Sequence, residues 1–161
     1  MVLDLGCGTG ESTRTIAEGA PDHWVFGLDR SEHRLAKAMA CPSPENARFV
    51  RCDAAHLSAL AAAAGWTIQR LYLLYPNPYP KPGHLRRRWH GHPVFPTLAR
   101  MCASIELRTN WDIYAEEFAQ GLVWMGREVE RRDVESAGTF TAFERKYLGR
   151  GERCYVVRSP A

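Results

Sequence analysis

Residues 2–10 read VLDLGCGTG, a short apolar run that leads into three alternating glycines. Residues 11–18 follow with the composition of a helix. Glycines between a strand and a helix let the backbone turn tightly and approach a ligand, and the amino terminus of the helix offers unpaired N–H donors. The stretch therefore predicts a strand, a glycine loop and a helix. A lone glycine motif is only weakly specific for a nucleotide site, and a turn that happens to be rich in glycine is the alternative.

A carboxylate follows the glycine loop at the distance that a nucleotide-binding unit requires. Residues 24–28 form a second apolar run, which ends at Asp29, about 20 residues after the loop. A carboxylate in this place can accept both hydroxyl groups of a ribose. The alternative is that Asp29 caps the helix predicted for residues 31–39.

A further aspartate follows the next strand. Residues 47–51 are predicted to form a third strand, and Asp53 comes shortly after it. Asp53 could accept a hydrogen bond from an adenine amino group, or it could cap the helix predicted for residues 55–64. Its position alone does not separate these two roles.

Strands and helices alternate along the whole chain. The further predicted strands are residues 71–75, 104–108, 128–134 and 153–158, and the further predicted helices run from 92 or 93 to 101, from 112 to about 125, and over 141–147. This alternation predicts an α/β fold, a doubly wound and mostly parallel sheet of seven strands with an antiparallel end and helices on both faces. With no linker or repeat, residues 1–161 fit a single domain.

Residues 71–88, LYLLYPNPYPKPGHLRRR, join an apolar run to a basic cluster. The run suits a buried strand that ends abruptly at Pro76. Four prolines between positions 76 and 82 predict a stiff, non-helical loop, which holds Asn77 and Tyr79 at the carboxyl end of a strand, where open α/β sheets bind ligands. The cations that follow form a candidate phosphate-binding patch, and an ordinary solvated face is the alternative. They are Lys81, His84, Arg86, Arg87 and Arg88.

Composition excludes several classes of protein. No apolar run approaches the ~20 residues of a membrane span and no charged and apolar leader opens the chain, so we expect a cytoplasmic protein. The net charge of +3 is too small to indicate a nucleic-acid partner by itself, and the local cluster of arginines matters more than the total. The five cysteines are scattered and lack a C-x-x-C spacing. We expect buried free thiols, with neither disulfides nor a metal site.

Two parts of the chain resemble known families. The glycine loop, followed by Gly27-Leu28-Asp29, resembles class I S-adenosylmethionine-dependent methyltransferases, whose first strand ends in D/E-x-G-x-G-x-G. More specifically, residues 75–81 with His84 and Arg86 to Arg88 resemble the F-P-D-P-W-P-K-x-R-H-x-K-R-R signature of the bacterial tRNA (guanine-N7)-methyltransferases. Residues 109–115 are similar to that family's T-D-W-E-x-Y-A, and the segment from Thr141 to Glu144 is similar to its T-x-F/Y-E.

The resemblance implies a Rossmann-like enzyme that transfers a methyl group from S-adenosylmethionine to N7 of a guanine in tRNA and releases S-adenosylhomocysteine. The residues it places around the cofactor are Asp4, Gly6, Gly8, Gly10, Asp29, Asp53 and Ala54. Those it places around the guanine are Asn77, Thr109, Thr141 and Glu144. Those it turns towards RNA phosphates are Lys81, His84, Arg86, Arg87 and Arg88. Neither a metal nor a membrane is expected, and the sequence leaves monomer and homodimer open.

The chain departs from the family pattern in three places. Asn77 stands where the family has aspartate, and it offers one carbonyl acceptor where aspartate accepts from both N1–H and the amino group of guanine. The chain begins at the first strand, without the amino-terminal segment with which relatives help to cover cofactor and RNA. Cys102-Ala103 replaces the family's L-x-P-G-G connector before a strand.

The sequence also leaves other functions open. Asn77-Pro78-Tyr79 resembles part of the N-P-P-Y motif of enzymes that methylate exocyclic or amide nitrogens, and a small-molecule acceptor is a further alternative. The non-enzymatic alternative is a degenerate methyltransferase fold that binds RNA or a partner without turnover. Thr109 and Thr141 could cap helices instead of contacting a base, and Glu144 could form a surface ion pair with a neighbouring cation.

Overall fold

The computed structural model describes residues 1–135 and 139–161. The strands in these residues are β1 (Val2–Leu5), β2 (Val25–Asp29), β3 (Ala47–Arg51), β4 (Ile68–Leu74), β5 (Cys102–Thr109), β6 (Glu130–Asp133) and β7 (Tyr155–Ser159). The helices are α1 (Glu11–Glu18), α2 (Glu32–Met39), α3 (Ala54–Ala63), α4 (Phe95–Met101), α5 (Asp112–Trp124) and α6 (Ala142–Leu148), with two short 3-10 helices, η1 (Pro82–Arg87) and η2 (Trp89–Gly91). None of these described helices is long and apolar enough to cross a membrane.

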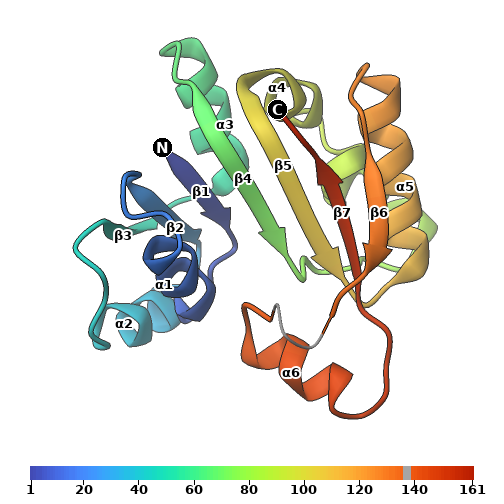
Figure 1. The fold of residues 1–161 in the computed structure, drawn as a ribbon. Helices are drawn as coiled ribbons and strands as arrows, with labels where there is room; N and C mark the ends of the chain where they lie inside the picture. Colours follow the sequence, from blue (N-terminus) through green and yellow to red (C-terminus); the bar gives the residue numbers. More distant parts are fainter. Residues whose placement is uncertain (136–138) are drawn as a thin grey trace.

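The strands form one sheet in the order β3-β2-β1-β4-β5-β7-β6. Strands β1 to β5 are parallel, whereas β7 runs antiparallel to both of its neighbours, β5 and β6. Figure 1 shows α1 and α2 in front of the sheet, and α3, α4 and α5 behind it. The predicted doubly wound, mostly parallel sheet of seven strands with an antiparallel end is therefore confirmed.

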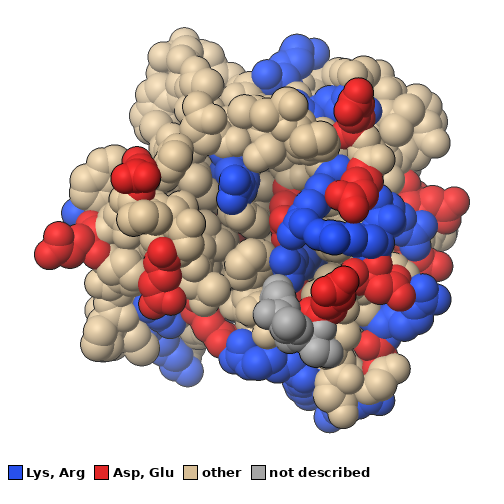
Figure 2. Space-filling model, in the orientation of Figure 1, with Lys and Arg blue, Asp and Glu red and all other residues tan. Residues whose placement is uncertain are grey.

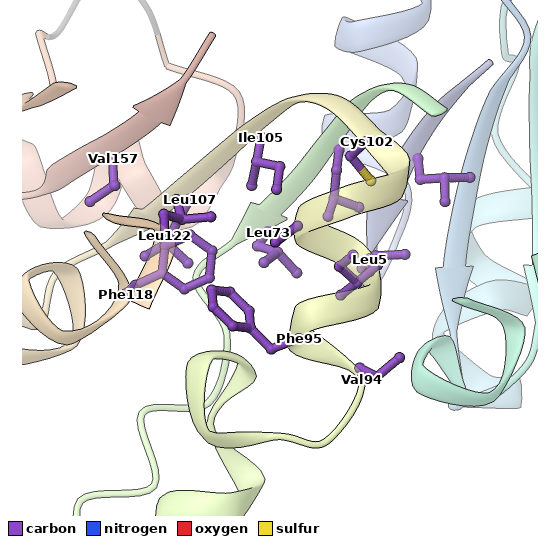
Figure 3. Packing of buried hydrophobic residues seen from close by; sticks show 14 of the residues in the cluster. Leu5, Leu73, Val94, Phe95, Cys102, Ile105, Leu107, Phe118, Leu122 and Val157 are labelled. Carbon is purple, nitrogen blue, oxygen red and sulfur yellow. The ribbon is translucent and has the colours of Figure 1, made fainter. Parts of the chain in front are cut away.

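The main hydrophobic core lies between the sheet and the helices behind it. Apolar side chains of β4 and β5 pack there against Leu98 of α4 and against Phe118 and Leu122 of α5. Figure 3 shows Leu107 of β5 packed with Phe118 and Leu122. Burying one such side chain is worth roughly 1.5–3 kcal/mol, so this layer holds β4 and β5 in the places from which the site is built.

The segment after β4 differs from its prediction. The sequence predicts a non-helical loop, but residues 82–91 form the two 3-10 helices η1 and η2. Pro82 occupies the first position of η1, where its missing N–H removes no helical hydrogen bond. The prediction is therefore wrong beyond Lys81, whereas the part from Pro76 to Lys81 contains no helix.

The cysteines also differ in part from their prediction. Cys7, Cys102 and Cys154 are buried free thiols, but Cys41 is exposed and Cys52 is half-buried. Cys41 lies just after the end of α2, in a connection at the surface, and Cys52 lies in the connection between β3 and α3. The expectation of buried thiols is therefore wrong for these two residues.

Arg127 joins the end of α4 to the start of β5. Strand β5 begins directly after Met101, so no connector separates it from the helix. All five guanidinium N–H groups of Arg127 are bonded, one of them to Ser159 Oγ and the others to main-chain carbonyls. The carbonyls are those of Ala99, Cys102, Ala103 and Pro160. This side chain compensates for the missing connector, and β5 is in parallel register with β4 from its first residue, Cys102.

We expect Arg127→Met to lower the free energy of unfolding by about 2–4 kcal/mol, because it removes the charged donor from several partly buried carbonyls. For a chain of this size, that loss corresponds to a fall of roughly 4–16 °C in the melting temperature, measurable by circular dichroism. Arg132→Met removes an exposed arginine from the edge strand β6 and is the matched control, for which little change is expected. Equal melting temperatures of the two variants would contradict this role of Arg127.

Candidate active site

A cavity of about 790 Å³ opens at the carboxyl ends of β1, β2, β3 and β4. Its volume lies in the range of about 300–1,000 Å³ that small-molecule sites occupy. From the predicted cofactor group it brings together Gly6, Asp29, Asp53 and Ala54, and from the predicted substrate loop it brings together Asn77, Tyr79, Arg86 and Arg87. Residues predicted for two different ligands therefore share one space.

The glycine loop borders this cavity with a left-handed backbone. Gly6 and Gly10 have φ angles of 85° and 78°, which side chains disfavour. A Cβ added to Gly6 would meet no atom within 4 Å, so Gly6 leaves open space for a ligand. A Cβ on Gly10 would lie 2.5 Å from the ring of Phe49, so Gly10 is required by packing. Gly8 contributes its N–H, which donates to Asp29 Oδ2 at 3.0 Å.

Asp29 lies at the end of β2 and is 8% exposed. Besides the bond from Gly8, its Oδ1 accepts from Ser31 N at 2.8 Å, and Arg34 Nη1 lies 3.5 Å from Oδ2. Each carboxylate oxygen can accept more than one hydrogen bond, so the group can hold the glycine loop and still receive hydroxyl donors from the cavity. Helix α2 is capped by Ser31, whose side chain accepts from Arg34 N, and not by Asp29.

Asp4 lies behind the glycine loop rather than in the cavity wall. It is 1% exposed, and its Oδ2 accepts from the hydroxyls of Ser12 and Thr13, both at 2.6 Å. Its other oxygen, Oδ1, is buried and has no hydrogen-bond partner in residues 1–135 and 139–161. Burial raises the pKa of Asp4, although the two hydroxyl donors oppose this shift. Asp4 therefore ties the first turn of α1 to β1 and keeps one acceptor beside the loop.

Asp53 caps α3. Its Oδ1 accepts from Ala55 N at 2.9 Å and from His56 N at 3.3 Å, and its Oδ2 lies 3.4 Å from Arg30 Nη1. Partial burial raises the pKa of Asp53, but these donors outweigh it and lower the pKa overall. The capping role is thus observed, while the contact with adenine stays a prediction. Ala54, in the first turn of α3, lies in the same cavity wall.

The loop that carries Asn77 has a strained residue on each side. Tyr75 has a φ angle of 53° and Tyr79 one of 43°, a conformation that costs a residue other than glycine of order 1–3 kcal/mol. Asn77 is exposed, and its Oδ1 accepts from Tyr79 N at 3.2 Å. Such strain persists only where neighbouring groups hold the backbone, and two sets of charged residues do so here.

The first set centres on Glu144, which is fully buried. Its Oε1 accepts from Tyr75 Oη at 2.8 Å and from Arg108 Nη1 at 3.0 Å, and its Oε2 accepts from Phe140 N at 2.6 Å. Burial raises the pKa of Tyr75, and the carboxylate of Glu144 adds to this effect. Glu144 thus fixes the end of β4 to β5 and α6, and it forms neither a surface ion pair nor part of the cavity wall.

The second set centres on Arg88, which is 8% exposed. Its Nε and Nη2 donate to Tyr79 O at 3.2 and 3.1 Å, and its Nη1 pairs with Glu117 of α5. Glu117 also contacts His90 Nε2 at 3.0 Å, and burial lowers the pKa of His90. The expectation that Arg88 faces RNA phosphates is corrected by this placement, because its donors are turned inward and hold the loop at Tyr79.

The other predicted residues fall into two groups. Thr109 Oγ1 accepts from Trp111 N at 3.1 Å before α5, and Thr141 Oγ1 caps α6 by accepting from Glu144 N at 3.1 Å. Thr141 therefore has the capping role, whereas Thr109 closes a turn before α5, which has no side-chain cap, and contact of either threonine with a base stays a prediction. The second group lies towards solvent: Lys81, Arg86 and Arg87 are exposed, and His84 is half-buried with its ring 6.0 Å from that of Tyr79.

The cavity wall also contains residues to which sequence analysis assigned no ligand. Three of them with aromatic rings are Trp89, His92 and Tyr114. Trp89 N donates to Tyr114 Oη at 2.9 Å, and Val94 N donates to His92 Nδ1 at 3.2 Å. The aromatic residues that follow the arginine run in the sequence were the only sign of their place in the cavity wall. Such residues occur just as often in a packed core, so the sequence could not assign them to a ligand. Among the described residues, no group of three potential ligands could hold a metal ion.

Comparison with known proteins finds relatives that are similar in sequence to much of this chain. A tRNA (guanine-N(7)-)-methyltransferase of Leifsonia xyli subsp. xyli is 32% identical over 120 residues, which cover 71% of this chain and 52% of that protein. The protein of the same name from Rhodopseudomonas palustris is 32% identical over 169 residues, which cover 98% of this chain and 64% of that protein. The chain therefore spans about half to two thirds of the length of these relatives.

Solved structures share the fold, and a family model matches the sequence. The 16S rRNA methyltransferase KamB superposes with a TM-score of 0.70 at 20% identity, covering 99% of this chain and 87% of that one. Residues 1–156 match the family model described as "Putative methyltransferase". The chain therefore belongs to this family of methyltransferases, and its resemblance to the tRNA (guanine-N7)-methyltransferases is confirmed.

Proposed function

We propose that the chain is an S-adenosylmethionine-dependent methyltransferase that acts on N7 of a guanine in tRNA. One observation carries the proposal: a single cavity joins Gly6 and Asp29 to Asn77, Arg86 and Arg87. A cofactor held by the glycine loop and a base held by the Asn77 loop would meet within it. The family match and the names of the relatives support the same reaction.

The residues present fit S-adenosylmethionine, which supplies an electrophilic methyl group when bound. Gly6 leaves open space where a side chain would intrude, and Asp29 offers a mostly buried carboxylate to ribose hydroxyls. Asp53 and Ala54 would border the adenine from the first turn of α3. Asp4 would support the glycine loop from behind, with its unpartnered Oδ1 as a remaining acceptor.

The proposed reaction needs no general base. Guanine N7 carries a free lone pair in the neutral base, so no proton has to leave before attack. The protein then has to align N7 with the methyl carbon and exclude water, and alignment is among the larger catalytic effects. We assign the base to Asn77. Thr109, Thr141 and Glu144 would act from behind the loop as positioning residues, because each is engaged within the protein.

One observation favours a different acceptor as the second candidate. The Oδ1 atom of Asn77 already accepts from Tyr79 N, which leaves one lone pair on that oxygen and the two NH2 donors for a ligand. Guanine N1–H and its amino group are both donors, and the remaining lone pair can accept from only one of them. Methyl transfer to another nitrogen nucleophile, or to a small molecule, would agree with this arrangement.

We expect the purified chain to bind S-adenosylmethionine and S-adenosylhomocysteine in the micromolar range by calorimetric titration, and Asp29→Ala to abolish binding, because it removes the ribose acceptor. Asp29→Asn keeps one side-chain oxygen for the Gly8 N–H and should weaken binding without unfolding the chain. Asp22→Ala removes an exposed aspartate before β2 and serves as control. Unchanged affinity in both Asp29 variants, or no binding by the folded chain, would overturn the cofactor assignment.

Asn77→Asp should raise the yield of N7-methylguanosine in unmodified tRNA by about tenfold or more, because a carboxylate can accept from the guanine donors while still accepting from Tyr79 N. Mass spectrometry of the digested tRNA measures the product. Asn77→Ala is the companion variant and should lower the yield. A yield that stays the same or falls in Asn77→Asp would count against guanine and favour the second candidate.

Arg86→Gln combined with Arg87→Gln should weaken tRNA binding and make it less dependent on salt. The salt slope, which is the fall in the logarithm of the binding constant per unit increase in the logarithm of the salt concentration, should decrease by about 1.4–1.8, as expected for two lost phosphate contacts. Arg88→Met should leave that slope unchanged and lower the turnover number, because the loop loses its hold on Tyr79. Fluorescence anisotropy over a salt series and single-turnover kinetics separate the two effects. A slope loss in Arg88→Met like that of the other variant would mean that Arg88 does contact phosphates.

A further inference from the structure

We propose that Lys146 of α6 and Arg150, two residues after the end of this helix, bind backbone phosphates of the RNA as a second patch beside the Asn77 loop. This inference rests on the proposed function, since the RNA is the tRNA substrate. The first patch is Lys81, Arg86 and Arg87, and the second comes from a helix more than fifty residues later in the chain.

Helix α6 lies directly against the start of the Asn77 loop. The ring of Phe143 is 4.5 Å from that of Tyr75, and Glu144 bonds to the Tyr75 hydroxyl from the buried side of the helix. Figure 1 shows α6 beyond the carboxyl ends of β4 and β5, at the edge where the cavity opens. A ligand that reaches Asn77 must therefore pass close to α6.

Helix α6 also contacts α1, the helix that follows the glycine loop. Glu11, its first residue, accepts from Ala142 N at 2.8 Å and pairs with Arg145. Helix α6 is thus fixed at both the cofactor side and the substrate side of the edge. With Glu144 turned inward, Lys146 and Arg150 are exposed to solvent.

The charge of these two residues is not neutralised within the described chain. The neighbouring arginines of β6, α6, β7 and the connection before β7 are paired with carboxylates: Arg131, Arg132, Arg145, Arg153 and Arg158. Figure 2 shows the same mixture, with blue and red side chains side by side over this part of the molecule. The Nζ atom of Lys146 lies 5.8 Å from the ring centre of Tyr147, and among the described residues no carboxylate forms an ion pair with Lys146 or Arg150. Both cations are therefore available to an external anion.

Unpaired cations are concentrated at this edge. In the part of the chain that the structure describes, the lysines and arginines whose side chains have neither a hydrogen bond nor an ion pair are Lys37, Lys81, Arg86, Arg87, Arg100, Lys146 and Arg150. Of these, Lys81, Arg86 and Arg87 follow β4, and Lys146 and Arg150 lie in α6 and just after it. A cation without a protein partner binds a phosphate without first losing an ion pair, and it releases counterions from the RNA. An RNA strand that contacts both patches would pass Asn77 between them.

The test is tRNA binding by Lys146→Gln combined with Arg150→Gln, followed by fluorescence anisotropy with an unmodified tRNA transcript over a salt series. We expect the salt slope to fall by about 1.4–1.8 and the affinity to fall several-fold at ~0.1 M salt. Lys37→Gln combined with Arg100→Gln removes the same charge from unpaired cations elsewhere, and its slope should stay unchanged. A normal slope in the α6 variant, or an equal loss in the control, would overturn the proposal.

The binding assay also separates this inference from the proposed function. Thermal unfolding and cofactor titration establish that the α6 variant is folded, and neither requires turnover. If the Arg86 and Arg87 variant loses slope and the α6 variant does not, only the inference about α6 fails. If neither variant loses slope, RNA is not the ligand of this edge and the proposed function fails with it.

Discussion

The carboxyl edge of the sheet depends on a group of alternating charges, of which three are buried and the fourth, Arg158, is partly exposed. Arg108 lies between Glu106 and Glu144, and Arg158 pairs with the second oxygen of Glu106. Burying charges is costly, and leaving one of them without its partner typically costs about 3–5 kcal/mol. These four groups have no net charge together, and they come from β5, β7 and α6. Ion pairing therefore determines where α6 can lie, and with it one wall of the approach to Asn77.

The same kind of interaction determines the conformation of the Asn77 loop. Tyr75 is held by Glu144, and the carbonyl of Tyr79 is held by Arg88, which is anchored on α5 through Glu117. Left-handed tyrosines cost of order 1–3 kcal/mol each, so neither conformation would persist in a free peptide. Prolines limit what the loop can do, but β5, α5 and α6 select the conformation that it has.

Sequence analysis predicts the structure around the glycine loop better than the structure around the Asn77 loop, and the reason is physical. The strands, the glycine loop and the place of Asp29 follow from local patterns of apolar residues and glycines, and the fold follows from their alternation. Arg88 and Glu144 could not be placed in this way. A charged side chain is buried only where a partner is available, and here the partners lie 29 and 36 residues away in the sequence. The arginine run therefore looked like one solvated patch, although η1 and η2 turn its last member inward.

The two loops also differ in what a substitution can change. The glycine loop is constrained by packing, because a Cβ on Gly10 would collide with Phe49. The Asn77 loop is constrained at Tyr75 and Tyr79, whereas the side chain of Asn77 is exposed and, among the described residues, its one hydrogen bond is the one from the Tyr79 N–H. An aspartate would accept the same bond. An exchange of asparagine for aspartate at position 77 therefore alters the donors and acceptors offered to a base while the loop keeps its conformation. The hydrogen-bonding groups at position 77 can therefore change while the fold stays the same, and position 77 is one of the places where this chain departs from the motif that it resembles.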